Sequence, residues 1–298
     1  MTGSEILDVP FVNSVFHPSD FSPESANAFA HALAIALIRR TEFAILHSGR
    51  DYLGEDEWTR FPPVRTTLER WGLLEKGSPR SAVFDALAVR VQKVSLRSLR
   101  PFAAVLDYLE GHPTDLIVLA TEGREGLPRW IRPSLAEKLA RRSETMTLFV
   151  PNSARGFVSL EDGEIRLRRI LVPVDHRPSP QAAIAYATRT TALTAGAPIE
   201  ILLLHVGDGE EMPEIELPEV PSCSWKRLQR TGEAVEEIIR VAAEQDVDLI
   251  AMATQGHEGV LDALRGSVTE QVVRRAPCPV LAVPAEPGGV VPSAVDLL

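Results

Sequence analysis

Residues 248–284, DLIAMATQGHEGVLDALRGSVTEQVVRRAPCPVLAVP, contain the pattern that decides the fold of this chain. The stretch reads as a buried strand, a loop bracketed by glycines, a capped helix and a second buried strand. A diverged copy occupies residues 115–151, DLIVLATEGREGLPRWIRPSLAEKLARRSETMTLFVP. The two align without a gap at an offset of 133 residues, and 16 of the 37 positions are identical. Such an internal repeat predicts two copies of one architecture.

The bulk composition narrows the class of protein. A chain of 298 residues is long enough for two domains that each bury a core. A hydrophobic content of 45% with 24% charged residues is typical of a soluble globular protein. The formal charge of −10 argues against a nucleic-acid partner, which normally requires a basic surface.

The sequence also indicates a compartment. The start, MTGSEILDVPFV, has no basic, apolar signal pattern, and no apolar run approaches the ~20 residues that span a bilayer. The two cysteines, Cys223 and Cys278, are too few for a disulfide framework and lack metal-ligand spacing. We therefore expect a cytoplasmic protein without a membrane partner.

Each half repeats one order of elements. In both halves we expect strand, helix, strand, an irregular connection, strand, helix, strand, glycine loop with helix, and strand. In the first half, Ser22 as N-cap and Pro23 at the first helical position begin the first helix. The predicted strands outside the repeat are 12–17, 42–47, 88–94, 170–174, 199–206 and 223–229, and the predicted helices are 26–38, 101–109 and 233–243. The fold class is therefore α/β, with two Rossmann-like open parallel five-stranded sheets covered by helices on both faces.

The junction between the halves is marked by residues 157–167, FVSLEDGEIRL, in which apolar residues alternate on both sides of Asp162-Gly163. This is the pattern of a β-hairpin. We expect one domain over residues 1–155 and a second over 156–298 that begins with this hairpin insert. The tail after Pro284 has no periodicity, which predicts a flexible or surface-docked end.

A group of polar residues in the second half follows predicted strand ends, and ligands in open α/β sheets bind at this edge. Asp175 and His176 follow the first strand, His205 closes the second, and residues 254–259 follow the fourth. Glycines let the backbone approach a ligand, and the free N–H groups of a helix start suit a phosphate. Ser267 and Glu270 have the spacing of a capping box, which defines that helix start.

Other interpretations of these residues stay open. Glycines after strands and capped helices also occur without a ligand, and His205 at the end of an apolar strand is explained by a structural role. His and carboxylate groups suit zinc, but the candidates lie on separate loops: Asp175, His176, His205 and His257. Capping already explains Ser267, which has no nucleophile elbow around it. Cys278 is explained as a small buried residue.

At this point the sequence resembles a tandem universal stress protein, with two such domains in one chain. The resemblance is carried by ILVPVD at 170–175, LHV at 204–206, DLI at 248–250, and Gly256-x-x-Gly259 followed by Gly266-Ser267 and APCPVL at 276–281. It covers nearly the whole chain. It implies a Rossmann-like α/β sandwich whose domains pair through their last strands, so that the two halves form a pseudo-dimer.

ATP-binding members of that family keep nine residues between Gly-x-x-Gly and the following Gly-Ser/Thr, whereas this chain has six, 260–265. In the first half Pro133 replaces the glycine and removes an N–H donor. The resemblance implies a nucleotide site in the second half, at Pro173, Val174, Asp175, His176, Val206, Thr254, Gly256, His257, Gly259, Gly266, Ser267, Val268 and Thr269. The degenerate first site consists of Asp20, Thr121, Gly123, Gly126 and Ser134.

Three functions compete on this basis. The leading one is a stress-response or regulatory protein whose second domain binds ATP, with Mg, or a related adenine nucleotide. Hydrolysis is expected to be slow at most, because no Walker lysine and no catalytic carboxylate pair is present. The alternatives are a nucleotide-free protein-interaction scaffold and, last, a metal-dependent or ATP-hydrolysing enzyme. A homodimer of tandem chains is a further expectation, and the sequence names no protein partner.

Overall fold

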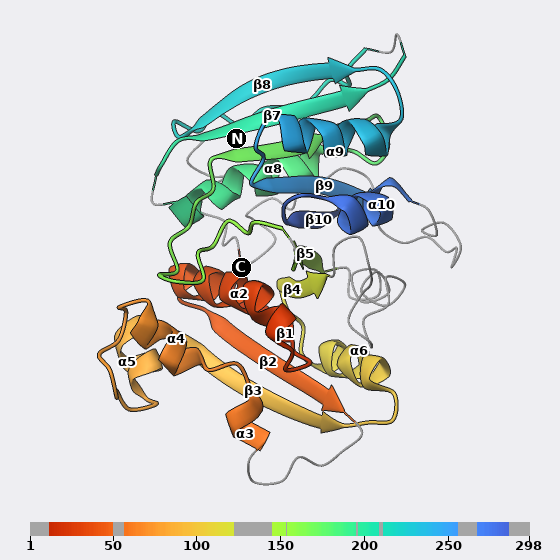
Figure 1. Cartoon of the computed structure of the whole chain (residues 1–298). Helices are drawn as coiled ribbons and strands as arrows, with labels where there is room; N and C mark the ends of the chain where they lie inside the picture. Colours follow the sequence, from red (N-terminus) through yellow and green to blue (C-terminus); the bar gives the residue numbers. More distant parts are fainter. Residues whose placement is uncertain are drawn as a thin grey trace, which may run out of the picture. The chain divides into compact units, whose positions relative to one another are not determined.

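The computed structural model describes residues 12–49, 57–121 and 145–285, except 153, 195, 209–210 and 256–266. The chain divides into two compact units, which we call the N-terminal unit (Val12–Ile165) and the C-terminal unit (from Arg166). Figure 1 shows their elements in sequence colours. Among the described helices, none is long and apolar enough to cross a membrane.

The N-terminal unit contains a parallel sheet in the order β3-β2-β1-β4-β5. The last two strands of this order, which begin and end the first copy of the repeat (115–151), are buried at every position. The strands are β1 (Ser14–Pro18), β2 (Glu42–Gly49), β3 (Arg90–Arg97), β4 (Leu116–Thr121) and β5 (Met146–Pro151). The helices are η1 (Pro23–Ser25), α2 (Ala26–Arg39), α3 (Glu57–Arg60), α4 (Val64–Arg70), α5 (Ala82–Leu87) and α6 (Pro101–Gly111).

The C-terminal unit has the same topology, in the order β10-β9-β6-β7-β8. The strands are β6 (Arg169–Pro173), β7 (Ile199–Val206), β8 (Cys223–Arg230), β9 (Leu249–Gln255) and β10 (Val280–Ala285). The helices are α8 (Gln181–Arg189), η2 (Thr190–Thr194), α9 (Ala234–Glu244) and α10 (Val268–Arg275). The predicted α/β class and parallel sheets are therefore confirmed, whereas the pairing of the halves as a pseudo-dimer stays a prediction.

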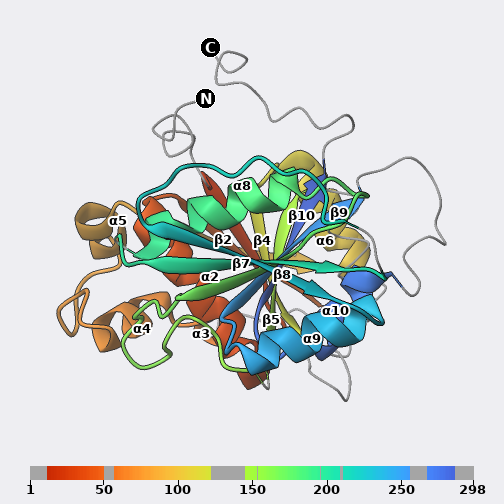
Figure 2. The same ribbon diagram turned by 90° about the horizontal axis from the view of Figure 1, so that it is seen from above.

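Helices cover both faces of the sheet in the C-terminal unit. Figure 2 shows α8 on one side of the strands and α9 and α10 on the other. The sequence of α9 explains this packing, because Val235, Ile238, Val241 and Ala242 are buried at helical spacing while the opposite side is charged. A sheet that is buried on both faces requires apolar strands. The sequence of β7, IEILLLHV, is accordingly mostly apolar.

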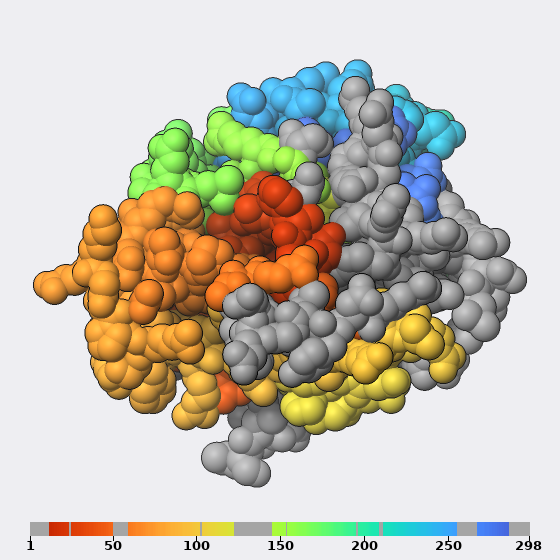
Figure 3. All heavy atoms as spheres, turned by 60° about the horizontal axis from the view of Figure 1, so that its bottom comes forward, coloured from red at the N-terminus to blue at the C-terminus, as the bar shows by residue number. Residues whose placement is uncertain are grey.

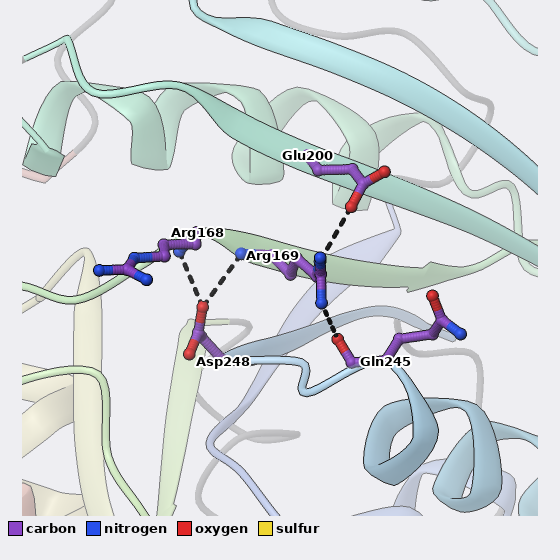
Figure 4. Close-up of polar contacts among 5 residues, drawn as sticks. All are labelled: Arg168, Arg169, Glu200, Gln245 and Asp248. Carbon is purple, nitrogen blue, oxygen red and sulfur yellow. Dashed lines mark hydrogen bonds and ion pairs between the residues drawn. The ribbon is translucent and has the colours of Figure 1, made fainter.

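A carboxylate joins the first and fourth strands of each unit at their amino ends. In the C-terminal unit, the backbone N–H groups of Arg168 and Arg169 donate to Asp248 Oδ2 at 2.8 and 3.0 Å (Figure 4). In the N-terminal unit, the N–H groups of Asn13 and Ser14 donate to Asp115 Oδ2 at 2.7 and 3.0 Å. The repeated Asp-Leu-Ile of the sequence is thus a structural anchor in both copies.

The C-terminal unit strengthens the same corner with a side-chain cation. Arg169 Nε lies 2.9 Å from Glu200 Oε2 on β7, and its Nη1 donates to the carbonyl of Gln245 at 2.7 Å (Figure 4). One arginine therefore connects β6 both to the neighbouring strand and to the end of α9. Because the pair is partly exposed, its contribution to stability is about 1 kcal/mol or less.

The predicted hairpin insert is present and belongs to the N-terminal unit by its contacts. Val158 and Ile165 form an antiparallel bridge around a turn in which Gly163 has a φ of 74°. The turn packs against the ring of Trp71, whose Nε1 donates to the carbonyl of Leu160 at 3.2 Å. Because Gly163 has a positive φ and faces an indole ring, a larger residue would be strained and crowded there.

A buried histidine holds the start of the insert. The N–H groups of Phe157 and Val158 donate to His31 Nε2 at 3.1 and 3.3 Å, and His31 Nδ1 bonds to the carbonyl of Asn27 at 2.7 Å. The Nδ1 atom therefore carries the proton and Nε2 is an acceptor. A Cβ at Gly156 would overlap the imidazole, so the chain passes the ring closely. Burial lowers the pKa of His31 to about 4.

The irregular segment after β2 forms a small helical lobe, which we define as residues 57–87. It contains α3, α4 and α5 and buries Phe61, Val64 and Leu68. In Figure 3 this lobe (orange) lies directly against the segment that contains α2 (red). The sequence predicts an irregular connection here, and the structure shows that it contains these three short helices.

We expect that Asp248→Ala destabilises the C-terminal unit by about 2–4 kcal/mol, because the backbone N–H groups of Arg168 and Arg169 both lose their acceptor, the buried Asp248 carboxylate. Urea denaturation followed by tryptophan fluorescence measures the change. Asp208→Ala, at an exposed position of the same unit, is the matched control and should change stability by less than about 0.5 kcal/mol. Equal stability of both variants would contradict the anchoring role.

We expect the neutral His31 to make stability depend on pH. Its folded pKa of about 4 lies below the model value of 6.5, so the unfolded chain binds a proton first and stability falls as the pH drops from about 6.5 to about 4. At pH 5.5 this difference in pKa lowers the free energy of unfolding by about 1.4 kcal/mol.

The measurement compares wild type with His31→Gln, which can accept the same bonds without titrating. Between pH 7.5 and 5.5 the variant should lose about 1.4 kcal/mol less than wild type in urea denaturation. Because carboxylates titrate in both proteins, this difference isolates the histidine. An identical loss in both proteins would show that His31 does not bear the pH dependence.

Candidate functional site

The candidate site lies at the carboxyl edge of the C-terminal sheet, where the strand order reverses between β6 and β9. The paired register of these two strands covers only Ile170 with Leu249 and Leu171 with Ile250, at the amino ends. By contrast, β7 pairs with β8 over eight residues. Strands joined only at their amino ends leave a crevice at the opposite end, and ligands bind in such crevices in open α/β sheets.

The chain after β6 is held at the crevice by His205. His205 Nδ1 lies 3.1 Å from the carbonyl oxygen of Val174, and the N–H of Val174 donates to the carbonyl of Leu204 at 2.8 Å. His205 is buried, and its Nε2 has no hydrogen-bond partner. The proton therefore lies on Nδ1, where it fixes the loop, which supports the structural interpretation of this residue.

Asp175 and His176 are the exposed groups that this loop presents. Asp175 Oδ1 accepts a hydrogen bond from the N–H of His176 at 2.6 Å, which leaves its other oxygen to solvent. The His176 ring stands edge-on to that of His205, with centroids 6.1 Å apart. The structure thus brings together three of the predicted site residues: a carboxylate and two imidazoles.

The helix that follows the glycine loop begins as the sequence predicts. The N–H of Glu270 donates to Ser267 Oγ at 3.2 Å, so Ser267 is the N-cap of α10. Val268 and Thr269 form its first turn, whose unbonded N–H groups carry partial positive charge. Thr254, near the end of β9, donates its hydroxyl to the carbonyl of Val283 at 3.3 Å.

Several predicted residues lie outside the part of the chain that the structure describes. In the second copy these are Gly256, His257, Gly259 and Gly266, and in the first copy Gly123, Gly126, Pro133 and Ser134. The predicted phosphate loop therefore stays a prediction. Its two flanks, Thr254 on β9 and Ser267 on α10, are placed.

The N-terminal unit repeats the same frame at its carboxyl edge. His47 Nδ1 lies 2.8 Å from the carbonyl of Ser19, and the N–H of Ser19 donates to the carbonyl of Leu46 at 2.8 Å. These bonds correspond to those of His205 and Val174. Asp20 differs from Asp175, because its Oδ1 accepts from both the N–H and the hydroxyl of Ser22, at 3.0 and 2.5 Å.

The prediction that Ser22 is the N-cap and Pro23 the first helical residue is confirmed by η1. Ser22 has the N-cap position before Pro23, but its hydroxyl makes no capping bond to the helix. The Ser22 hydroxyl donates instead to Asp20 Oδ1, a charged acceptor two residues earlier that also receives the Ser22 N–H. Ser22 therefore closes the loop after β1 instead.

Aromatic and imidazole side chains meet one another at the carboxyl edge of the N-terminal unit. Phe21, with a φ of 64°, stacks on His47 at 3.9 Å between ring centroids and meets Phe61 edge-on at 5.0 Å. Between β1 and β4, which pair over only two residues, the buried His17 Nδ1 reaches the carbonyl of Val118 at 3.0 Å. Burial lowers the pKa of His17 to about 4, so it is neutral.

Sequence reasoning missed Phe21 and His17. The sequence did contain a signal. At the offset of 155 residues that aligns Asp20 with Asp175, Phe21 corresponds to His176 and His17 corresponds to Val172, so the two copies differ in residue type at both positions. This loop position carries a bulky aromatic in one copy and an exposed histidine in the other. Val172 is apolar and forms no side-chain bond across the crevice.

The described residues add neither a metal-ligand cluster nor a reactive thiol to this edge. Among the described residues, no group of three or more His, Cys, Asp or Glu side chains is arranged to hold a metal ion. Burial raises the pKa of the Cys278 thiol, which keeps it protonated. This agrees with the interpretation of Cys278 as a small buried residue.

The fold and this edge define a class: an open, parallel α/β protein of Rossmann-like topology, present twice in one chain. The model of the universal stress protein family matches residues 14–151 and 219–284. Because these segments cover more than half of the chain, the chain belongs to the universal stress protein family. The resemblance stated from the sequence is thereby confirmed.

Individual relatives support the same assignment. A universal stress protein of Methanothermobacter thermautotrophicus is 48% identical over 61 residues, which are 20% of this chain and 41% of that protein. The chain thus spans less than half the length of the first relatives it matches. Universal stress protein Sll1654 of Synechocystis is 29% identical over 154 residues, 45% of this chain and 95% of the relative.

One solved structure has a similar fold over most of this chain. The crystal structure of a universal stress protein from Archaeoglobus fulgidus superposes with a TM-score of 0.58, covering 92% of this chain and 99% of that one. The sequence identity is 16%, so this likeness concerns the fold alone.

We expect that His205→Ala frees the loop after β6. The Val174 carbonyl loses its partner and a buried ring is removed, which costs about 2–4 kcal/mol and exposes the Val174 amide to exchange. Hydrogen–deuterium exchange of the peptide around residues 172–176 measures the change. His176→Ala, on the same loop but exposed, should leave exchange at Val174 unchanged. Equal exchange in both variants would contradict the pinning role.

Proposed function

We propose that the chain is a cytoplasmic stress-response or regulatory protein whose C-terminal unit binds ATP or a related adenine nucleotide. One observation carries this proposal: the two units share a frame of strands and histidines, but their loops after the first strand differ. In the N-terminal unit Phe21 stacks on His47 and His17 bonds to the carbonyl of Val118, whereas the C-terminal unit has an exposed His176 and an apolar Val172 at the corresponding places and presents an exposed carboxylate, Asp175. A protein that uses one copy for binding and the other for support would have this asymmetry.

The groups at the C-terminal edge fit the parts of a nucleotide. Asp175 has a free carboxylate oxygen that can accept hydrogen bonds from ribose hydroxyls. The first turn of α10, at Ser267, Val268 and Thr269, offers N–H groups of the kind that bind phosphate oxygens. Apolar side chains at the end of β7, including Val206, suit the face of a base.

The chemistry available to this edge is binding rather than fast catalysis. Phosphoryl transfer needs cationic groups or Mg²⁺ at the phosphates and a group that orients the nucleophile. The predicted loop at 256–266 has no lysine. We therefore propose that any hydrolysis is slow.

Isothermal titration calorimetry with Mg-ATP tests the proposal. We expect wild type to bind, Gly259→Asp to lose binding through charge repulsion with the phosphates, and Asp175→Ala to bind about tenfold more weakly. Asp20→Ala, at the corresponding place of the N-terminal unit, is the matched control and should bind as wild type does. Absence of binding at millimolar nucleotide would overturn the proposal and favour the scaffold alternative.

A further inference from the structure

The outer strand of the C-terminal sheet carries positive charge. β8 is bonded to β7 over eight residue pairs and ends the strand order, so its other backbone edge has no partner strand among the described residues (Figure 1). The strand contains three basic residues and no acidic one: Lys226, Arg227 and Arg230. The side chains of Lys226 and Arg227 are exposed. β8 is therefore an accessible edge whose exposed charges are cationic.

These cations make the edge of β8 selective. Successive side chains of a strand point to opposite faces, so Lys226 and Arg230 lie on one face of β8 and Arg227 lies on the other. An antiparallel pair of β8 strands centred on these residues would set cation against cation, which is destabilising. Cations on an edge strand thus prevent self-pairing, and the same charges attract a strand that is acidic.

An acidic segment of the same unit has the complementary charge. It consists of residues 211–220, which form neither helix nor strand and precede β8, and we call it the acidic strap. The apolar side chains of Ile215 and Leu217 are half-buried. The strap has no basic residue, and its four acidic residues are all exposed: Glu211, Glu214, Glu216 and Glu219. The strap therefore presents carboxylates outward along its length.

The first residue of α8, Gln181, holds the middle of the strap in an extended conformation. Gln181 Nε2 donates to the carbonyl of Glu216 at 2.8 Å, and the N–H of Glu216 donates to Gln181 Oε1 at 3.3 Å. In an extended backbone the N–H and C=O of one residue point to the same side, and those of its two neighbours point to the opposite side. The backbone groups of Ile215 and Leu217 are therefore turned away from Gln181. The strap thus has the geometry of a short strand that can pair along this second edge.

We propose that two copies of this chain associate through β8 of one copy and the acidic strap of the other. The occupant is a second copy because the chain itself carries both halves of the pair, a cationic strand edge and an acidic extended segment. A two-fold axis forms this contact twice, and each contact sets cations against carboxylates. The backbone groups of Ile215 and Leu217 can add to the edge of β8 as a short extra strand. The homodimer expected from the sequence thereby receives a defined interface.

Sedimentation velocity of the full chain, without nucleotide, tests the proposal. We expect a dimer at about 100 µM chain in about 0.05 M salt, and dissociation in about 0.5 M salt, because salt screens exposed charges. Two variants reverse the charges of one surface each: Lys226→Glu with Arg227→Glu on β8, and Glu214→Lys with Glu216→Lys on the strap. Each variant alone should have a dimer Kd at least about a hundredfold higher than that of wild type.

An equimolar mixture of the two variants is the decisive measurement. In a mixed dimer the acidic β8 of one variant meets the basic strap of the other, and the remaining contact keeps its native charges. We therefore expect the mixture to dimerise at the concentration at which each variant is monomeric.

Arg97→Glu with Arg100→Glu is the matched control, because it makes the same change of net charge at exposed positions of the N-terminal unit. It should dimerise as wild type does. The proposal is overturned if wild type is monomeric in low salt, if the β8 variant stays dimeric, if the mixture stays monomeric, or if the control dissociates as the β8 variant does. Circular dichroism verifies that each variant is folded. If a β8 reversal does not fold, Lys226→Gln with Arg227→Gln replaces it and should raise the Kd at least about tenfold.

Discussion

The bond from an aspartate carboxylate to two backbone N–H groups is the constraint on which each unit depends. The first and fourth strands are neighbours in the sheet but lie about 80 to 100 residues apart in sequence, as for Arg168 with Asp248 and Ser14 with Asp115. They share only two residue pairs, so the ladder alone holds them weakly. The carboxylate fastens their amino ends, and the carboxyl ends are left to form a crevice. The two strands can therefore separate at their carboxyl ends and form a crevice, because the aspartate holds their amino ends together.

The two units show how one frame supports two outcomes. A histidine at the end of the second strand fixes the loop after the first strand in both, as His47 and His205 do through their Nδ1 atoms. What differs is the residue that this loop presents: Phe21 stacks on its histidine, whereas His176 is exposed and meets its histidine edge-on. The divergence of the copies is thus concentrated at the edge, while the anchors beneath it are kept.

Much of this arrangement could be predicted from the sequence. The repeat at 115–151 and 248–284 predicts its own strands, because their apolar runs and flanking glycines are local signals. The hairpin at Asp162-Gly163 and the cap at Ser267 were equally local, and both are confirmed. The N-cap position of Ser22 was predicted as well, whereas the hydrogen bond of its hydroxyl to Asp20 is seen only in the structure.

The sequence by itself determined the family, the α/β class, the two copies and the residues that follow the strand ends, because each depends on short-range patterns and their order. Only the tertiary structure decided that Phe21 stacks on His47, that His17 bonds to the carbonyl of Val118, and that His31 and Trp71 hold the insert. Those contacts join residues that are tens of positions or more apart, as Trp71 and Leu160 are. Their physical basis is the packing of side chains brought together by the strand order, which periodicity along the chain does not encode.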